Sequence, residues 1–205
     1  MRLGLGRGWI AAAMLLAQPS GAEAHIVAAR LGDFYMGALH PFTDLQDIIL
    51  WTATGVLAGS LGASKGRWLI LVFPLGLLVG LPLGRFFGAT FTGLADATMM
   101  LTLGLLLAAA SQIPTYLLCA IAFGLAVLRG AANGVDLGPD NDRLLFALGL
   151  ACVGYAFITL MMALTVVFRG TAPDGPASWR TIAVRAIGGW IAAIGLMMAS
   201  FVLAT

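Results

Sequence analysis

Charged residues are scarce in this chain of 205 residues: Asp, Glu, Lys and Arg make up 10% of it. A soluble domain carries about 25% of such residues. Hydrophobic residues make up 60% of the chain, so too few charges remain to cover a surface that faces water. This composition excludes an ordinary soluble domain and predicts that the lipid bilayer is the main partner.

A strong charge of either sign is also lacking, since the formal net charge is +2. The basic residues are scattered, and no run of them forms the positive patch that a nucleic-acid partner requires. The chain shows no nucleophile–base pair, and its 27 glycines are spread through apolar segments instead of forming a phosphate-binding loop. We therefore expect neither a nucleic-acid-binding protein nor an enzyme.

Cysteine and histidine are rare, with two of each. Cys119 and Cys152 lie inside apolar segments without CxxC spacing, so we interpret them as small packing residues and not as a disulfide or metal pair. The two histidines are His25 and His40, and any site that uses imidazole must use one of them.

The first 24 residues read as a signal peptide. Arg2 and Arg7 form a basic start, residues 9–17 form a short apolar core, and residues 22–24 (Ala-Glu-Ala) fit the small-x-small cleavage pattern. The apolar core is too short to span about 30 Å of hydrocarbon. We expect a mature chain that begins at His25 outside the cytoplasm; the alternative is an uncleaved membrane anchor.

Six apolar segments follow, each near the ~20 residues that a spanning helix needs, with the fourth the shortest. They cover approximately residues 45–63, 68–84, 89–110, 114–128, 144–168 and 182–204. The sequence thus predicts an all-α fold, a six-transmembrane-helix bundle formed by residues 25–205. With a signal peptide in front, it predicts a multi-pass protein of a bacterial inner membrane whose mature N-terminus is periplasmic.

Small residues recur at four-residue spacing in two of these segments. The two series are Gly55–Gly59 and Gly76–Gly80–Gly84. In lipid, such faces let helices approach closely, so we interpret both as helix-packing seams.

Two carboxylates lie at membrane depth: Asp47 falls about one turn into the first helix, and Asp96 falls within the third. An ionisable group there costs at least about 2.5 kcal/mol and usually faces the bundle interior with a partner. The two are explained equally well by an ion or proton pathway and by internal salt bridges with Arg129 or Arg85.

His40 and Asp44 lie four residues apart, but Pro41 disfavours a helical conformation at His40. We expect His40 to end a short amphipathic segment and Asp44 to lie in the first turn of the next helix. A carboxylate in a first turn is stabilised by the helix dipole.

The segment LHPFTDLQDIILWTATGVLAG, residues 39–59, resembles the opening signature of the HupE/UreJ membrane proteins, H-P-x-x-G-x-D-H followed by x-x-x-M-x-x-V-G. His40, Pro41 and Gly55 match this pattern. Asp44, Gln46, Asp47 and Trp51 replace its glycine, aspartate, second histidine and methionine.

The segment RGAANGVD, residues 129–136, stands where that family has H-G-x-A-H-G-x-E. The matching residues are Gly130, Ala132 and Gly134. Arg129 and Asn133 replace the two histidines, and Asp136 replaces the glutamate.

The resemblance implies a hydrogenase or urease accessory membrane protein regarded as a nickel or cobalt permease. It also implies a metal or polar site at five positions: His40, Asp44, Asp47, Asn133 and Asp136. Nickel and cobalt favour imidazole ligands, whereas Arg129 cannot coordinate a metal. Asp47 and Arg129 therefore form a possible ion pair, and the remaining oxygen donors suit a harder cation or no metal.

Two functions remain open from the sequence. The first is a divergent transporter or permease of a divalent metal cation, which would be a substrate. The second is a non-transporting accessory or scaffold subunit that kept the fold and lost the metal site. His25 adds a possible N-terminal ligand, because a free amine and imidazole there would chelate copper together with His40.

Overall fold

The computed structural model describes residues 32–87, 92–135, 137–138, 141–170 and 179–204, apart from the side chains of residues 85–87 and 92. Within these ranges the chain is helical and contains no strand, as the all-α prediction requires. The elements are α3 (Asp33–Leu39), the 3₁₀ turn η1 (His40–Phe42), α4 (Leu45–Leu61), α5 (Ala63–Gly66), α6 (Leu69–Phe87), α7 (Thr92–Ala108), α8 (Thr115–Val135), α9 (Arg143–Arg169) and α10 (Trp179–Ala204). The predicted signal peptide and His25 lie outside the described residues.

Four helical stretches in the described part of the chain are long and apolar enough to cross a membrane. They are Ala63–Gly84, Thr115–Val135, Arg143–Arg169 and Trp179–Ala204. Two further apolar helices, Leu45–Leu61 and Gly93–Ala108, are shorter. At 1.5 Å per residue, the 17 residues of α4 extend roughly 25 Å, which is less than the hydrocarbon thickness of about 30 Å. The count of six spans therefore stays a prediction.

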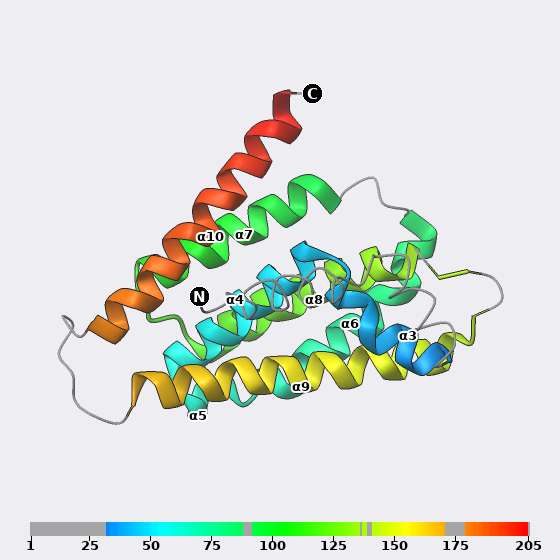
Figure 1. The fold of residues 1–205 in the computed structure, drawn as a ribbon, viewed down its shortest axis with the longest axis horizontal. Helices are drawn as coiled ribbons and strands as arrows, with labels where there is room; N and C mark the ends of the chain where they lie inside the picture. The colour runs from blue at the N-terminus through cyan, green and yellow to red at the C-terminus, as the bar shows by residue number, and fades with distance from the viewer. Residues whose placement is uncertain (1–31, 88–91, 136, 139–140, 171–178, 205) are drawn as a thin grey trace, which may run out of the picture.

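The helices pack in pairs around α4 (Figure 1). α6 packs against α8, and α7 packs against α10, while α9 contacts α3, α4 and α6. α4 contacts α7, α8, α9 and α10, and its residues Leu50, Trp51 and Ala53 are almost fully buried. α4 is thus the central helix, and a polar group on its inner face meets side chains from several neighbours.

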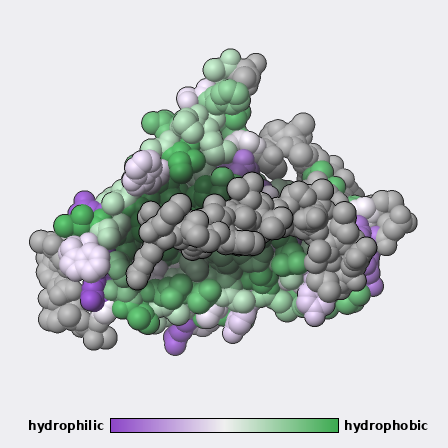
Figure 2. Space-filling model, in the orientation of Figure 1, coloured by the Kyte–Doolittle hydropathy of each residue, from purple (hydrophilic) through white to green (hydrophobic). Residues whose placement is uncertain are grey.

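The surface of the described helices is largely apolar. Figure 2 shows hydrophobic residues over most of the described surface on the face that it views. Large exposed apolar side chains on α10 include Trp190, Met197 and Phe201. Cys152 is also exposed and Cys119 is half-buried; both are free thiols, so tight packing does not account for Cys152.

The glycine seam of α6 is confirmed. A Cβ atom added at Gly76 would lie 2.6 Å from the Cβ of Ala126, and one at Gly80 or Gly84 would overlap the carbonyl of Val127 or Ala131 on α8. α8 contributes glycines to the same seam, since Gly130 and Gly134 pack against the backbone of α6. The second series, Gly55 and Gly59, faces Met161 and Thr165 of α9 in the same way.

The structure extends the fourth predicted helix beyond residue 128, since α8 continues to Val135. A charged residue normally marks the end of a membrane helix, which placed the predicted boundary before Arg129. Arg129 is instead buried and paired with carboxylates, so the helix continues past it and carries Asn133 into the protein interior.

We expect Gly80→Ala to lower the free energy of unfolding by about 1–3 kcal/mol, because overpacking of a tight contact costs that much. Gly124→Ala is the matched control: a Cβ there meets nothing within 4 Å, so stability should hold or rise slightly. Thermal unfolding of both variants in detergent tests the difference, and equal melting temperatures would contradict the seam.

Candidate functional site

The entry to α4 positions the first group of polar residues. Pro41 lies in the 3₁₀ turn and is buried, and the Thr43 hydroxyl donates to the carbonyl of His40 at 2.7 Å. Asp44 then adopts an extended conformation and accepts a hydrogen bond from the backbone N–H of Gln46 at 2.9 Å. Asp44 is therefore the N-cap of α4 and not, as predicted, a residue of its first turn; the N-cap side chain satisfies an otherwise unpaired helical N–H.

A second set of contacts fixes α3 against the start of α9. The Asp33 carboxylate accepts from the backbone N–H of Asp142 and from the side-chain amide of Asn141, both at 2.8 Å. These hydrogen bonds, the backbone one foremost, lower the pKa of Asp33, since they favour the charged carboxylate. Gly37 of α3 packs directly on the backbone of Phe146, which places the rings of His40 and Phe146 with their centroids 5.8 Å apart.

The guanidinium of Arg129 is the centre of the polar cluster. Its Nε donates to Asp47 Oδ1 at 2.7 Å, and one terminal nitrogen donates to Asp96 Oδ2 at 2.8 Å. The other terminal nitrogen pairs with Asp44 Oδ2. Gln46 Oε1 accepts a longer contact of 3.4 Å. Arg129 thereby joins α8 to α4 and α7 through three carboxylates.

The contacts of Arg129 matter for stability because most of the charged side chains are buried. The side chains of Arg129, Asp47 and Asp96 are 2%, 1% and 2% exposed, while that of Asp44 is 41% exposed. Charges removed from water are tolerated only when they are paired and hydrogen-bonded. Asp44 and Asp47 also lie at the N-terminus of α4, where the helix dipole favours negative charge.

Asn133 lies one turn beyond Arg129 on α8 and completes the cluster. Its Nδ2 donates to Asp47 Oδ2 at 2.9 Å and to the Arg129 carbonyl at 2.7 Å. Its Oδ1 is buried and accepts no hydrogen bond within the described part of the protein. Both oxygens of Asp47 thus accept hydrogen bonds, whereas the amide oxygen of Asn133 has no donor among the described residues.

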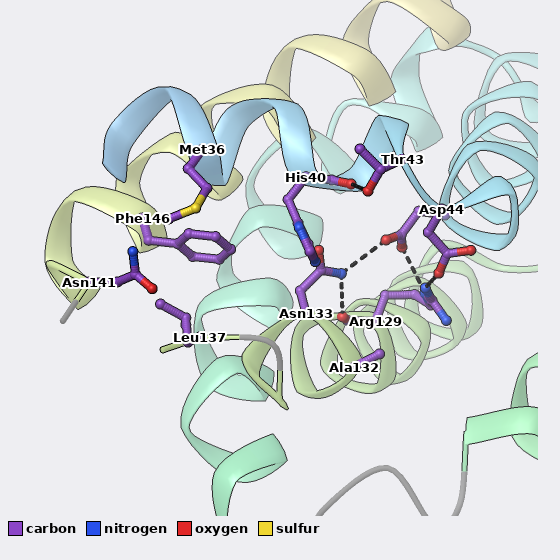
Figure 3. Close-up of a pocket in the computed structure, with 11 residues that line it drawn as sticks. Met36, His40, Thr43, Asp44, Arg129, Ala132, Asn133, Leu137, Asn141 and Phe146 are labelled. Carbon is purple, nitrogen blue, oxygen red and sulfur yellow. Dashed lines mark hydrogen bonds and ion pairs between the residues drawn. The ribbon is translucent and has the colours of Figure 1, made fainter. Parts of the chain in front are cut away.

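A cavity of about 570 Å³ opens beside the cluster (Figure 3). Its polar lining residues are His40, Thr43, Asp44, Asp47, Arg129, Asn133 and Asn141, and its apolar ones are Met36, Ala132, Leu137 and Phe146. Asp44, Arg129 and Asn133 gather where α4 and α8 meet, whereas α3 and the start of α9 supply the opposite wall, where Asn141 lies beside Met36 and Phe146.

The structure therefore brings together four of the five residues predicted for the metal or polar site: His40, Asp44, Asp47 and Asn133. The fifth, Asp136, lies outside the described residues, as does the proposed N-terminal ligand His25. Of the two arginines considered for Asp96, the structure pairs it with Arg129; the side chain of Arg85 is not described. Among the residues that the structure describes, no group of three or more His, Cys, Asp or Glu side chains is placed to hold a metal ion.

Several residues of the site were not predicted from the sequence. Gln46 was noted only as a motif replacement, although its amide reaches Arg129. Met36, Asn141 and Phe146 line the cavity but carry no local signal, because their place depends on how α3 packs on α9.

We expect Arg129→Ala to lower the free energy of unfolding by about 3–5 kcal/mol, since it leaves buried carboxylates without their cation. Asp47→Asn in the same chain should restore part of this loss. A double-mutant cycle measured by unfolding in detergent tests the pairing. Strictly additive effects of the two substitutions would contradict it.

No curated protein and no solved structure matches this chain. The model of the family described as HupE / UreJ protein matches residues 12–198, which is nearly the whole chain and includes both polar motifs. The chain therefore belongs to the HupE/UreJ family.

Proposed function

We propose that this protein is a transport-related membrane protein that binds a divalent metal cation in the cavity beside Arg129. Membership of the HupE/UreJ family suggests a nickel- or cobalt-related accessory or transport role at a membrane. In the proposed orientation, the cavity opens to the periplasmic side of a bacterial inner membrane, where the mature N-terminus also lies.

The charge of the cluster is the observation that supports cation binding most directly. Three carboxylates, Asp44, Asp47 and Asp96, surround one guanidinium, so two negative charges remain in excess when all are ionised. Two of these carboxylates, Asp44 and Asp47, line the cavity together with Arg129, so the lining carries a net negative charge, which attracts cations. The Asp44 side chain borders the cavity and is 41% exposed, so it is the carboxylate that an entering cation meets first.

The donor atoms favour a hard cation over nickel or cobalt. The cavity presents carboxylate and amide oxygens from Asp44, Asp47 and Asn133, with His40 as its one imidazole. Oxygen donors suit magnesium, calcium or manganese, whereas nickel and cobalt bind better to nitrogen. Manganese and magnesium therefore belong in any transport test beside nickel and cobalt.

One observation favours the second function, an accessory subunit without transport. Arg129 already supplies a cation to the cluster, and both oxygens of Asp47 are engaged by Arg129 and Asn133. In this alternative the ion pair stabilises the bundle in place of a bound metal, and the protein acts through contacts with other membrane proteins.

Uptake into proteoliposomes distinguishes the two functions. We expect the protein to raise uptake of at least one of Ni²⁺, Co²⁺, Mn²⁺ and Mg²⁺ above that of empty vesicles. Asp44→Asn should slow this uptake by roughly tenfold, because it removes one charge near the ion. Asp142→Asn is the matched control: Asp142 caps α9 as Asp44 caps α4, and it does not line the cavity. Uptake no faster than in empty vesicles for all four ions would favour the accessory function.

Restoring the family histidines gives an independent test. The variant Asp47→His/Arg129→His/Asn133→His replaces the guanidinium by imidazoles that coordinate nickel. We expect it to be less stable than the parent protein without metal and to regain several degrees in Tm when Ni²⁺ is added, because binding to the folded state stabilises it. An unchanged Tm in Ni²⁺ would show that these three positions do not converge on one metal site.

A further inference from the structure

We infer that the end of the bundle opposite the cavity binds the phosphate headgroup of an anionic phospholipid. The site is a small pocket at the ends of α4, α7, α9 and α10, with Arg169 and Arg185 in its lining; we call it the basic pocket. Its other polar lining residues are Ser60, Ser111, Gln112 and Thr181. The inference does not rest on the proposed cation-binding function, because the basic pocket and the cavity share no lining residue.

The length of α9 places the basic pocket at the level of lipid headgroups. α9 begins beside the cavity, which Phe146 lines, and ends at Arg169 in the basic pocket. Its 27 residues extend roughly 40 Å, more than the hydrocarbon thickness of about 30 Å. Figure 1 shows the end of α9 and the start of α10 together at the end of the molecule away from α3. The exposed side chains of Trp68 and Trp179 also lie at this end, and exposed tryptophans are typical of the headgroup region.

The charges of the described residues are divided between the two ends of the bundle. The described acids cluster around the cavity and the turn beside it; they are Asp33, Asp44, Asp47, Asp96 and Asp142. The opposite end carries five basic residues, Lys65, Arg67, Arg169, Arg180 and Arg185. Within the residues that the structure describes, none of these five pairs with a carboxylate. Asp174 in the segment between α9 and α10 lies outside the described residues, and five basic residues less this one acid still leave a charge of +4, which attracts anions.

Each arginine of the basic pocket is held by a backbone carbonyl and keeps donors for a ligand. A terminal nitrogen of Arg169 donates to the carbonyl of Ser60 at the end of α4. The Nε of Arg185 donates to the carbonyl of Ala108 at the end of α7, at 2.8 Å. A guanidinium has five N–H donors, so most of them remain after these contacts. Capping of helix ends explains one contact of each side chain, but it does not explain why both arginines line one pocket.

The size of the basic pocket favours a phosphate oxygen over a buried metabolite. The pocket measures about 30 Å³, which is room for roughly one or two water-sized groups. One phosphate oxygen fits this space while the rest of the headgroup lies at the mouth. The forked donors of arginine match phosphate oxygens well. Thr181, in the first turn of α10, also lines the pocket, and the dipole at a helix N-terminus favours an anion there.

Apolar side chains beside the basic pocket favour a lipid over a free phosphate ion. Leu105 of α7 and Ile182 of α10 are each 55% exposed, and each lies within one turn of a residue that lines the pocket. Acyl chains cover such side chains while the headgroup contacts the arginines. In the proposed orientation this end faces the cytoplasm, where the leaflet carries anionic lipids and basic pockets between membrane helices bind their headgroups.

Native mass spectrometry of the full-length protein in detergent measures the binding of single lipid molecules. We expect the first molecule of phosphatidylglycerol to bind at least about fivefold tighter than phosphatidylcholine, whose choline group neutralises its own phosphate. Inorganic phosphate at the same concentration as the lipid should leave phosphatidylglycerol binding unchanged, because it has no acyl chains to cover the apolar side chains beside the pocket.

Two variants locate the lipid in the basic pocket. Arg185→Gln should weaken the binding of the first phosphatidylglycerol by about fivefold, because it removes one cation next to the headgroup. Arg67→Gln is the matched control: it removes the same charge at the same end but does not line the pocket, so binding should change less than about twofold. Thr181→Phe should also weaken binding, because it fills the pocket without altering any charge. Thermal unfolding without lipid shows that each variant is folded, and Thr181→Phe provides the test if Arg185→Gln is not.

Three outcomes would overturn the inference. Equal losses in Arg185→Gln and Arg67→Gln would show that lipid responds to the overall charge of this end and not to the basic pocket. Equal binding of phosphatidylcholine would show that the acyl chains alone are recognised. Displacement of the lipid by an equal concentration of inorganic phosphate would show that the pocket takes free phosphate. None of these measurements uses a metal ion, so their results are independent of the cation uptake that tests the proposed function.

Discussion

The packing of α4, α7 and α8 depends on one buried cation, the guanidinium of Arg129. Three carboxylates on two other helices point at it, and two of these, Asp47 and Asp96, are as deeply buried as Arg129 itself. Arg129, Asp47 and Asp96 would each be strongly destabilising in an apolar bundle without the others, since an unpaired buried charge is among the most costly features of a fold. The planar fork of an arginine, with its five donors, joins several carboxylates at once, which a lysine cannot do in the same geometry. The register of α4, α7 and α8 is therefore set by this contact together with the glycine seam of α6 and α8.

Much of the fold follows from the sequence because its physical basis is local. Apolar segments of near-spanning length predict helices in lipid, and glycines four residues apart predict the seam that Gly80 and Gly84 form. The end of α8 does not follow in this way. A charged residue within an apolar sequence usually marks the end of a membrane helix. Only the carboxylates of two other helices show that Arg129 lies in the protein interior.

The candidate site was predictable in part for the same reason. Two short motifs suggested that Asp47 and Arg129 lie together, and the structure places them 2.7 Å apart. The inclusion of Asp44 and Asp96 in one cluster depends on the convergence of three helices, which no spacing within the chain encodes. Likewise, Phe146 meets His40 only because α3 packs on the start of α9 and Asp33 binds the Asn141–Asp142 turn. The proline at residue 41 predicted a break in the chain but not the partners on either side of it.

The departures from the family pattern have one physical consequence in common. Asp47 and Arg129 stand where the family pattern has histidines, so two imidazoles that could bind a metal are replaced by two groups of opposite charge. Neutral imidazoles coordinate a metal by replacing its water. Carboxylates already engaged by a guanidinium accept hydrogen bonds more readily than they give up those contacts, because breaking them exposes a buried charge. The partly exposed Asp44 extends this charged network to the edge of the cavity. In the proposed function, a cation at that edge balances the excess negative charge without displacing Arg129, so the ion pair and a bound ion are compatible parts of one site.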